Sequence, residues 1–232
     1  MDPKPNTTKP TRNALRTATL KELQTADTIA QAAQREPFAT ALTGAEVTAA
    51  TVATLRADIA TCHQTLDGAF DADQDHKGQT SAESEKHRAL VAFLRRIQAA
   101  ASQKYARDPQ SKHKLAQYGI GTDLLRSRTI LAQYAPGILA QLADESLPGL
   151  DEDFATRVAQ ALTDWTEAES AQAQAQQTAT QKRTEAQAQV KTITDRRIQI
   201  QYAIEGIYPY SEKESAAARA AFLLPKTRPF RG

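Results

Sequence analysis

Three aspartates at alternate positions are the first residues whose type and spacing could form a functional site, here a metal-binding loop. Asp71, Asp73 and Asp75 have the spacing of the first three ligands of a calcium-binding loop. Such a loop also needs a glycine at its sixth position and a glutamate at its twelfth, where this chain has His76 and Ala82. The pattern therefore predicts a solvated polar turn and no metal site.

The histidines and the single cysteine suggest two other kinds of site, and their spacing argues against both. A di-iron centre in a helical bundle uses Glu-x-x-His pairs, and none occurs in the sequence. Cys62 and His63 are adjacent, so on a helix their side chains point about 100° apart and cannot pair directly as thiolate and imidazolium. We expect no catalytic residue, no metal and no cofactor, and a protein that is not an enzyme.

Two short motifs have structural explanations. Gly119-Ile120-Gly121 lacks the third glycine and the preceding strand of a dinucleotide-binding motif, so it predicts a helix break. Arg95-Arg96 recurs as Arg196-Arg197, and each pair is followed by Ile-Gln. Each pair fits the solvated face of a helix near its C-terminal part, where cations suit the helix dipole. The recurrence also suggests a shared contact with a carboxylate of another helix or subunit.

The elements that position these residues are helices. The chain has 44 alanines among 232 residues, and no proline lies between Pro37 and Pro109 or between Pro148 and Pro209. Alanine is the best helix former and proline the strongest helix breaker, so long helices are expected, and strand patterns are nearly absent. Leu, Ile, Val and Phe together number only 41, so we expect an all-α fold with thin packing.

Apolar residues at helical spacing mark the ends of the long segments. One stripe near residue 154 and another near residue 200 enclose a stretch, residues 168–189, whose only apolar face is alanine. The stripes consist of Phe154, Val158, Leu162 and Trp165, and of Val190, Ile193, Ile200, Ile204 and Ile207.

The order of landmarks predicts an internal duplication. The two arginine pairs lie 101 residues apart, Tyr105 and Tyr208 lie 103 apart, and Tyr118 and Phe222 lie 104 apart. We therefore expect helical repeats at residues 20–122 and 123–224. Each repeat would be a helical hairpin, and together they would form an elongated, antiparallel protomer resembling a four-helix bundle.

The first hairpin turn is expected within residues 71–80, at Gly78. The matching turn, near residues 172–181, has no helix breaker, so one continuous helix of about 55 residues is the alternative there. This layout, with LAQYGIG at residues 115–121 closing the first unit, resembles an uncharacterised group of bacterial two-repeat helical proteins. The resemblance covers roughly residues 20–225 and implies an architecture but no activity and no functional residues.

The two ends of the chain each carry a net positive charge, while the residues between them are net negative. Residues 1–21 and residues 213–232 each have a net charge of +4, which leaves −6 for residues 22–212 because the whole chain carries +2. Prolines in residues 1–19 and 225–232 predict extended tails. Basic tails on an acidic helical body favour docking onto a neighbouring copy, although such tails also bind nucleic acid or anionic lipid.

These features predict a non-enzymatic structural protein, a filament or sheath subunit that assembles with itself through basic tails and aromatic hairpin ends. The alternative is a helical adaptor or nucleic-acid-associated protein that uses the same tails; nucleic acid is the less favoured partner because the tails have only one aromatic residue for stacking. The expected assembly residues are Lys4, Lys9, Arg12, Tyr118, Tyr208, Tyr210, Phe222, Lys226, Arg228, Phe230 and Arg231.

Location is only weakly determined by the sequence. No apolar run approaches the roughly 20 residues that cross a bilayer, and the N-terminus has no apolar core of a signal peptide. A single cysteine cannot form an internal disulfide. A cytoplasmic protein is the default expectation, and assembly at a cell surface stays open.

Overall fold

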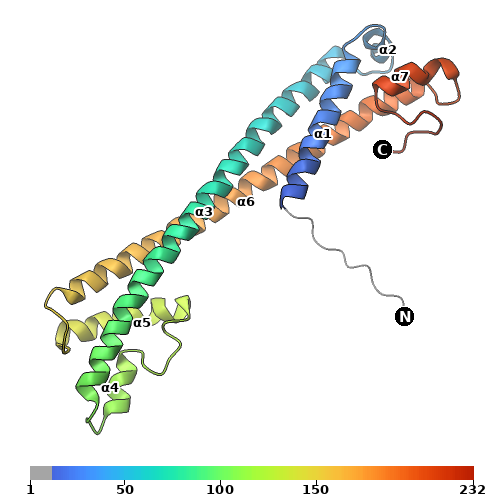
Figure 1. The fold of residues 1–232 in the computed structure, drawn as a ribbon. Helices are drawn as coiled ribbons and strands as arrows, with labels where there is room; N and C mark the ends of the chain where they lie inside the picture. The colour runs from blue at the N-terminus through green and yellow to red at the C-terminus, as the bar shows by residue number, and fades with distance from the viewer. Residues whose placement is uncertain (1–11) are drawn as a thin grey trace, which may run out of the picture. The chain divides into compact units, whose positions relative to one another are not determined.

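The computed structural model describes residues 12–232, with side chains from Arg16 onwards, and these residues form helices and no strand (Figure 1). The prediction of an all-α fold is confirmed. No single described helix is long and apolar enough to cross a membrane. The helices are α1 (Arg12–Ala33), α2 (Phe38–Gly44), α3 (Ala49–Tyr105), α4 (Ser111–Gln117), α5 (Arg128–Asp144), α6 (Phe154–Ile207), the 3-10 helix η1 (Lys213–Ser215) and α7 (Ala216–Ala221).

The chain divides into two compact units. Unit 1 contains residues up to 71 and from 180 onwards, and unit 2 contains residues 72–179. Both long helices therefore contribute to both units: unit 1 has the first part of α3 and the last part of α6, and unit 2 has the reverse. Because this division follows contacts and not sequence similarity, the repeat boundaries at 20–122 and 123–224 stay a prediction.

The core of unit 1 joins α1, α3 and α6. Leu23 and Ile29 of α1 are fully buried with Leu55 of α3 and with Ile200 and Ile204 of α6. Phe222, directly after α7, closes this core and meets the ring of Phe38 edge-on at 5.3 Å. The predicted apolar stripe near residue 200 is thus the α6 contribution to the core.

The core of unit 2 forms around the single tryptophan. Trp165 is fully buried with Phe154 and Val158, as the stripe near residue 154 predicts, while Leu162 is partly buried beside them. α5 begins at a cap in which the Ser127 hydroxyl accepts a hydrogen bond from the Ile130 N–H. Capping of this kind orients the helix start, and the buried side chains of α5 then complete the core.

The expected hairpin turn within residues 71–80 is wrong. α3 runs unbroken through this segment, including Gly78, from Ala49 to Tyr105. The physical reason is that one glycine costs a helix interior only about 1 kcal/mol, and no proline accompanies it. α6 is also continuous, at 54 residues, so the alternative of one long helix is the one that the structure adopts.

The expected extended N-terminal tail is also corrected in part. Residues 1–11 lie outside the described residues, but residues 12–19 are the first turns of α1 and are not extended. From Arg12 to Ala33 the chain has no proline or glycine and is rich in alanine, so it contains no strong helix breaker. Residues 225–232 form no helix and contain bends at residues 226–228.

Gly78 provides a direct check of the continuous helix. An added Cβ at this position would meet no atom within 4 Å, so Gly78→Ala should raise stability by about 0.5–1 kcal/mol through helix propensity alone. Denaturant unfolding measures the change, and Gly68→Ala, in the same helix and equally open, is the matched variant. A clear loss of stability in Gly78→Ala would indicate a turn and contradict the helix.

Candidate functional site

A buried arginine organises the C-terminal part of unit 1. Arg219 of α7 has no exposed surface. Its Nη1 donates hydrogen bonds to Oε2 of Glu205 at 2.7 Å and to the carbonyl of Tyr208 at 3.0 Å. Its Nε and Nη2 donate to the carbonyl of Pro225, and Nη2 also donates to the carbonyl of Arg228. The guanidinium thus connects α6, α7 and the segment 225–232.

This arrangement compensates for the burial of charge. Removing a guanidinium from water costs several kcal/mol unless a counter-charge and further acceptors replace the lost water. Glu205 supplies the counter-charge, and the three carbonyls fill the remaining donor positions of a planar group with five N–H bonds. The consequence is a C-terminal segment held on its own chain.

Aromatic contacts extend the same attachment. The Phe230 ring meets the Tyr202 ring edge-on at 5.1 Å, and the Phe230 N–H donates to Glu205. The Gly232 N–H donates to the Tyr202 hydroxyl at 3.1 Å. Phe230, an expected assembly residue, is therefore partly buried against its own unit.

Five exposed side chains near the C-terminal end of unit 1 are together called the C-terminal patch here. It consists of Tyr210, Leu223, Lys226, Arg228 and Arg231, all exposed. Tyr210 and Leu223 expose 45% and 51% of their surface, which is high for large apolar side chains. Within residues 16–232, no carboxylate forms an ion pair with any of the three patch cations.

The other expected assembly residues are differently placed. Tyr118 and Phe222 are fully buried, so their burial removes them from contact with a second molecule. Tyr208 is partly buried, with its ring 6.0 Å from that of Phe38. Lys4 and Lys9 lie outside the described residues, as does the side chain of Arg12.

Sequence reasoning missed Arg219 as a structural centre, because it treated this residue only as one of the cations near the C-terminus. The available signal was its position as the single charged residue in the run Ala216–Ala221. A lone arginine among alanines next to an apolar segment indicates a buried, hydrogen-bonded group. The identity of its partners gave no signal, because three of them are backbone carbonyls.

The Arg196-Arg197 pair binds carboxylates of other helices within unit 1. Arg197 Nε donates to Oε1 of Glu22 in α1 at 2.6 Å, and Arg196 pairs with Asp58 in α3. Arg96 of the other pair instead lies over the Phe154 ring, 4.8 Å from its centroid. An interhelix carboxylate contact is therefore found for the second pair, and the two pairs do not share it.

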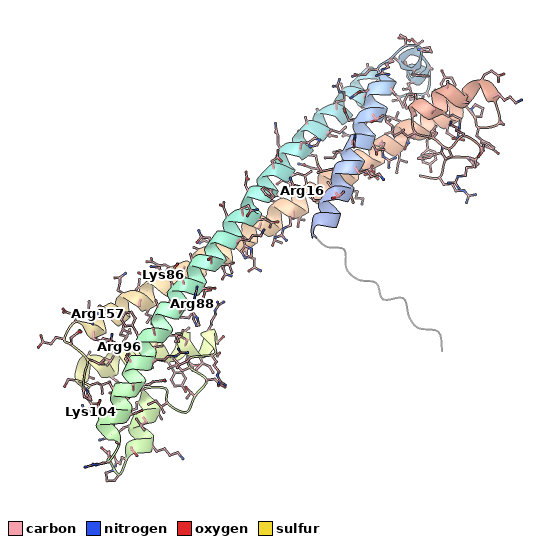
Figure 2. All side chains as sticks on the ribbon, in the orientation of Figure 1. Arg16, Lys86, Arg88, Arg96, Lys104 and Arg157 are labelled. Atoms are coloured by element: carbon pink, nitrogen blue, oxygen red, sulfur yellow. The ribbon has the colours of Figure 1, made fainter. Side chains whose placement is uncertain are left out.

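Cations of unit 2 also form ion pairs; Figure 2 labels two of them, Lys86 and Arg157. Lys86 pairs with Asp164 at 2.8 Å, and Arg157 pairs with Asp151 at 2.8 Å. The Arg157 guanidinium holds the pKa of the Asp151 carboxyl below its usual value. Exposed pairs of this kind are screened by solvent, so they orient surface side chains and stabilise little.

A carboxylate of unit 2 holds two tyrosines. Glu145 Oε2 accepts hydrogen bonds from the hydroxyls of Tyr105 and Tyr118, while Lys104 lies 2.6 Å from Oε1. The Lys104 ammonium, followed by the phenols, lowers the pKa of Glu145 to about 2. Burial, followed by the bond to Glu145, raises the pKa of Tyr118. At neutral pH the carboxylate is ionised and both phenols are protonated, so the cluster acts as a clamp between α3, the end of α4 and the end of α5.

A second carboxylate is buried deeper in unit 2. Glu83 of α3 is fully buried, accepts the Trp165 indole N–H at 2.9 Å and pairs with Arg128 at 2.6 Å. The His87 ring lies 5.9 Å from that of Trp165, and its buried Nε2 has no hydrogen-bond partner among the described residues. Burial, followed by the Arg128 charge, lowers the pKa of His87. Glu83 thereby fixes α5 and α6 against α3.

The ends of α4 and α7 have the same local structure. After α4, Gly119 adopts φ +71°, and the Ile120 N–H donates to the carbonyl of Leu115. After α7, Leu223 adopts φ +55°, and the Leu224 N–H donates to the carbonyl of Arg219. Both are helix ends of the Schellman type, which need a left-handed residue at this point.

The residue before each left-handed turn is held in the same way. The Gln98 side-chain amide of α3 donates to the carbonyl of Tyr118, and the Gln201 amide of α6 donates to the carbonyl of Phe222. In both units a fully buried aromatic residue ends the short helix.

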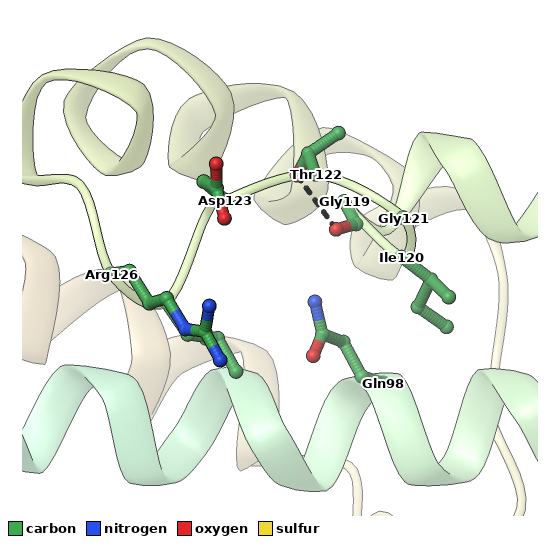
Figure 3. Close-up of a pocket in the computed structure, with 8 residues that line it drawn as sticks. Gln98, Gly119, Ile120, Gly121, Thr122, Asp123 and Arg126 are labelled. Atoms are coloured by element: carbon green, nitrogen blue, oxygen red, sulfur yellow. Dashed lines mark hydrogen bonds between the residues drawn. The ribbon is translucent and has the colours of Figure 1, made fainter.

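A hollow of about 250 Å³ lies beside the first of these turns in unit 2 (Figure 3). Its lining combines a glycine loop with polar side chains and two apolar residues: Gln98, Gly119, Ile120, Gly121, Thr122, Asp123, Leu125 and Arg126. The Gly-Ile-Gly motif is thus a helix break, as expected, and also the wall of a cavity.

Comparison with known proteins gives no further guide: no protein-family model, no curated protein and no solved structure matches this chain.

The role of Arg219 can be tested by measuring the stability of a variant and the protease resistance of its C-terminal segment. Arg219→Ala should lower the free energy of unfolding by about 3–5 kcal/mol, since it removes the counter-charge of Glu205 and the guanidinium donors of three carbonyls. Protease should then cleave residues 225–232 faster than in the wild type. Arg228→Ala removes an exposed side chain and should change stability by less than about 0.5 kcal/mol. Equal effects of the two variants would contradict the buried anchor.

Glu145 predicts an acid dependence of unit 2. Its folded pKa of about 2 is below the ordinary 4.5, so its contribution is complete above pH 4.5 and is lost as pH falls towards 2. Glu145→Gln should lower the free energy of unfolding at neutral pH. Between pH 4.5 and pH 2, the stability of this variant should fall less than that of the wild type. Fluorescence of Trp165, the only tryptophan, measures unfolding of unit 2. The control, Glu152→Gln, is exposed and should keep the wild-type profile, and the prediction fails if Glu145→Gln keeps it too.

Proposed function

We propose that this chain is a non-enzymatic structural protein that assembles with copies of itself through its C-terminal patch. The observation that carries this proposal is the Arg219 anchor, which holds a basic segment in one conformation while Lys226, Arg228 and Arg231 remain exposed. A segment already ordered on its own chain loses less conformational entropy on binding than a free tail. The proposal moves the contact from free tails to an ordered surface.

Apolar side chains in the patch support the same function. Leu223 occupies the left-handed position where glycine is favoured, and it directs a large apolar side chain into water. Tyr210 is also exposed, and its ring centroid lies 6.0 Å from the Arg219 guanidinium. Exposed aromatic and aliphatic groups among arginines are typical of the centre of a protein interface.

A complementary surface exists on the same chain. Residues 144–153 contain five acidic residues and no basic one. Glu145 and Asp151 are paired with Lys104 and Arg157, whereas Asp144, Glu152 and Asp153 are exposed and have no ion pair among the described residues. We infer that the patch cations of one copy bind these three carboxylates of the next, a head-to-tail contact that can continue into a filament or close into a ring.

The proposal includes the tandem duplication, in an altered form. Each repeat contains a helix, a long helix and a short helix: α1, α3 and α4 with 22, 57 and 7 residues, then α5, α6 and α7 with 17, 54 and 6. Two hydrogen bonds of the turn after α4 recur 104 residues later after α7: Gly119 to Ala116 matches Leu223 to Ala220, and Ile120 to Leu115 matches Leu224 to Arg219. These likenesses support repeats built on one long helix each, not on hairpins.

Charge reversal tests the proposed contact. The triple variant Lys226→Glu, Arg228→Glu, Arg231→Glu should lose self-association, as should Asp144→Lys, Glu152→Lys, Asp153→Lys. An equimolar mixture of the two should associate again, because the reversed charges complement each other. Sedimentation velocity and negative-stain microscopy at rising protein concentration measure association, which should weaken with salt for the wild type.

The matched control reverses three exposed cations of unit 2, in the variant Arg95→Glu, Arg107→Glu, Lys112→Glu, which should associate like the wild type. A wild-type chain that stays monomeric at all concentrations contradicts the proposal. Submicromolar binding of duplex DNA at physiological salt by such a monomer would favour the alternative, a nucleic-acid-associated adaptor.

A further inference from the structure

The hollow beside the Gly-Ile-Gly motif is a feature that self-assembly does not use. α4 and α7 end in equivalent turns, so the segment after each turn can be compared position by position. Counting 104 residues onward from unit 2, Asp123 corresponds to Thr227 and Arg126 to Phe230. In unit 1 the Phe230 ring packs against Tyr202, whereas in unit 2 the charged residue Arg126 lines an open hollow. The turn itself therefore needs neither Asp123 nor Arg126.

The polar groups of the hollow have unused hydrogen-bonding capacity. Arg126 is exposed, and within residues 16–232 no carboxylate pairs with it, Asp123 included. Gln98 uses its Nε2 to hold the Tyr118 carbonyl, and its Oε1 accepts no hydrogen bond from the described residues. Figure 3 shows the Arg126 and Gln98 side chains reaching toward each other from the loop and from α3.

Backbone conformation keeps the loop wall open. Gly119 and Gly121 adopt φ values of +71° and +89°, which side chains with a Cβ rarely adopt. At Gly119 an added Cβ would also lie 2.4 Å from a Leu124 methyl group. Thr122 ties the loop to itself, because its hydroxyl and its N–H both donate to the Gly119 carbonyl. The wall is thus formed without side chains at two of its positions.

The lining has one cation, one anion, one free amide oxygen and two apolar side chains. Arginine binds a carboxylate through two parallel N–H bonds, and a carboxylate and an amide oxygen together accept the N–H bonds of an ammonium. Ile120 and Leu125 contribute apolar surface to the lining. A ligand with only one charge would leave the opposite protein charge unpaired, while a zwitterion satisfies both.

We propose that this hollow binds a small free α-amino acid with an apolar side chain. Its carboxylate would bind Arg126, its ammonium would bind Asp123 and the Gln98 oxygen, and its side chain would contact Ile120 and Leu125. The volume of about 250 Å³ lies just below the range of drug-sized pockets and suits a ligand of this size. The site is independent of the proposed assembly, since no patch residue lines it.

Backbone amide shifts in the full chain test the site, with L-leucine as the probe. The amides of Gly119, Gly121 and Asp123 should shift and saturate at millimolar L-leucine. The same titration with 4-methylpentanoate, which lacks the ammonium, and with 3-methylbutylamine, which lacks the carboxylate, should give affinities at least about tenfold weaker. No saturable shift with L-leucine, or equal binding of either single-charge analogue, overturns the proposal.

Variants separate binding from folding. Arg126→Gln and Asp123→Asn should each weaken L-leucine binding at least about tenfold while amide signals elsewhere in unit 2 keep their positions. Arg107→Gln and Asp75→Asn, exposed residues of unit 2 outside the hollow, are the matched controls and should bind like the wild type. Undiminished binding by Arg126→Gln would place the ligand elsewhere. Self-association is measured separately and is expected to be the same in all four variants.

Discussion

A shortage of large apolar side chains governs how both units hold together. Leu, Ile, Val and Phe supply only 41 of 232 residues, so long helical stretches have alanine as their only apolar contact. Each unit concentrates its bulky residues in one cluster and adds buried polar groups to it, Arg219 in unit 1 and Glu83 in unit 2. Apolar packing is not directional, whereas the hydrogen bonds of these buried polar groups are satisfied in only one arrangement of the helices. The carboxylates and the guanidinium thereby fix which helices meet.

The fold class could be predicted from the sequence, but its connections could not. Alanine content and the spacing of prolines determine helix formation locally, so the all-α prediction needed no knowledge of tertiary contacts. The expected turn at Gly78 failed because a single glycine is compatible with both a turn and a helix interior, and neighbours far along the chain decide between them. The apolar stripes were predictable, since periodicity alone identifies the buried face of α6.

The candidate site residues were harder to predict from the sequence than the fold class. Arg219 looked like one more surface cation because its partners are mostly carbonyls, which every residue has. Tyr118 and Phe222 looked like exposed ends, although each is the buried closure of a short helix. The glycine motif was visible, but the hollow beside it depends on Gln98 of another helix and on the absence of a partner for Arg126. Sequence spacing carries no information about a missing contact.

The division of the long helices between the units bears on how the chain is made. Residues 72–179 are continuous, so unit 2 can complete its core as soon as Ala179 has left the ribosome. Unit 1 needs Glu22 beside Arg197, 175 residues later, and also needs Phe222, so it can close only after Phe222 has been synthesised. Until then the apolar faces of α1 and of the start of α3 lack their contacts with α6 and Phe222. Among the described helices, α1 is therefore made first and is among the last to complete its contacts, because its partners on α6 come much later.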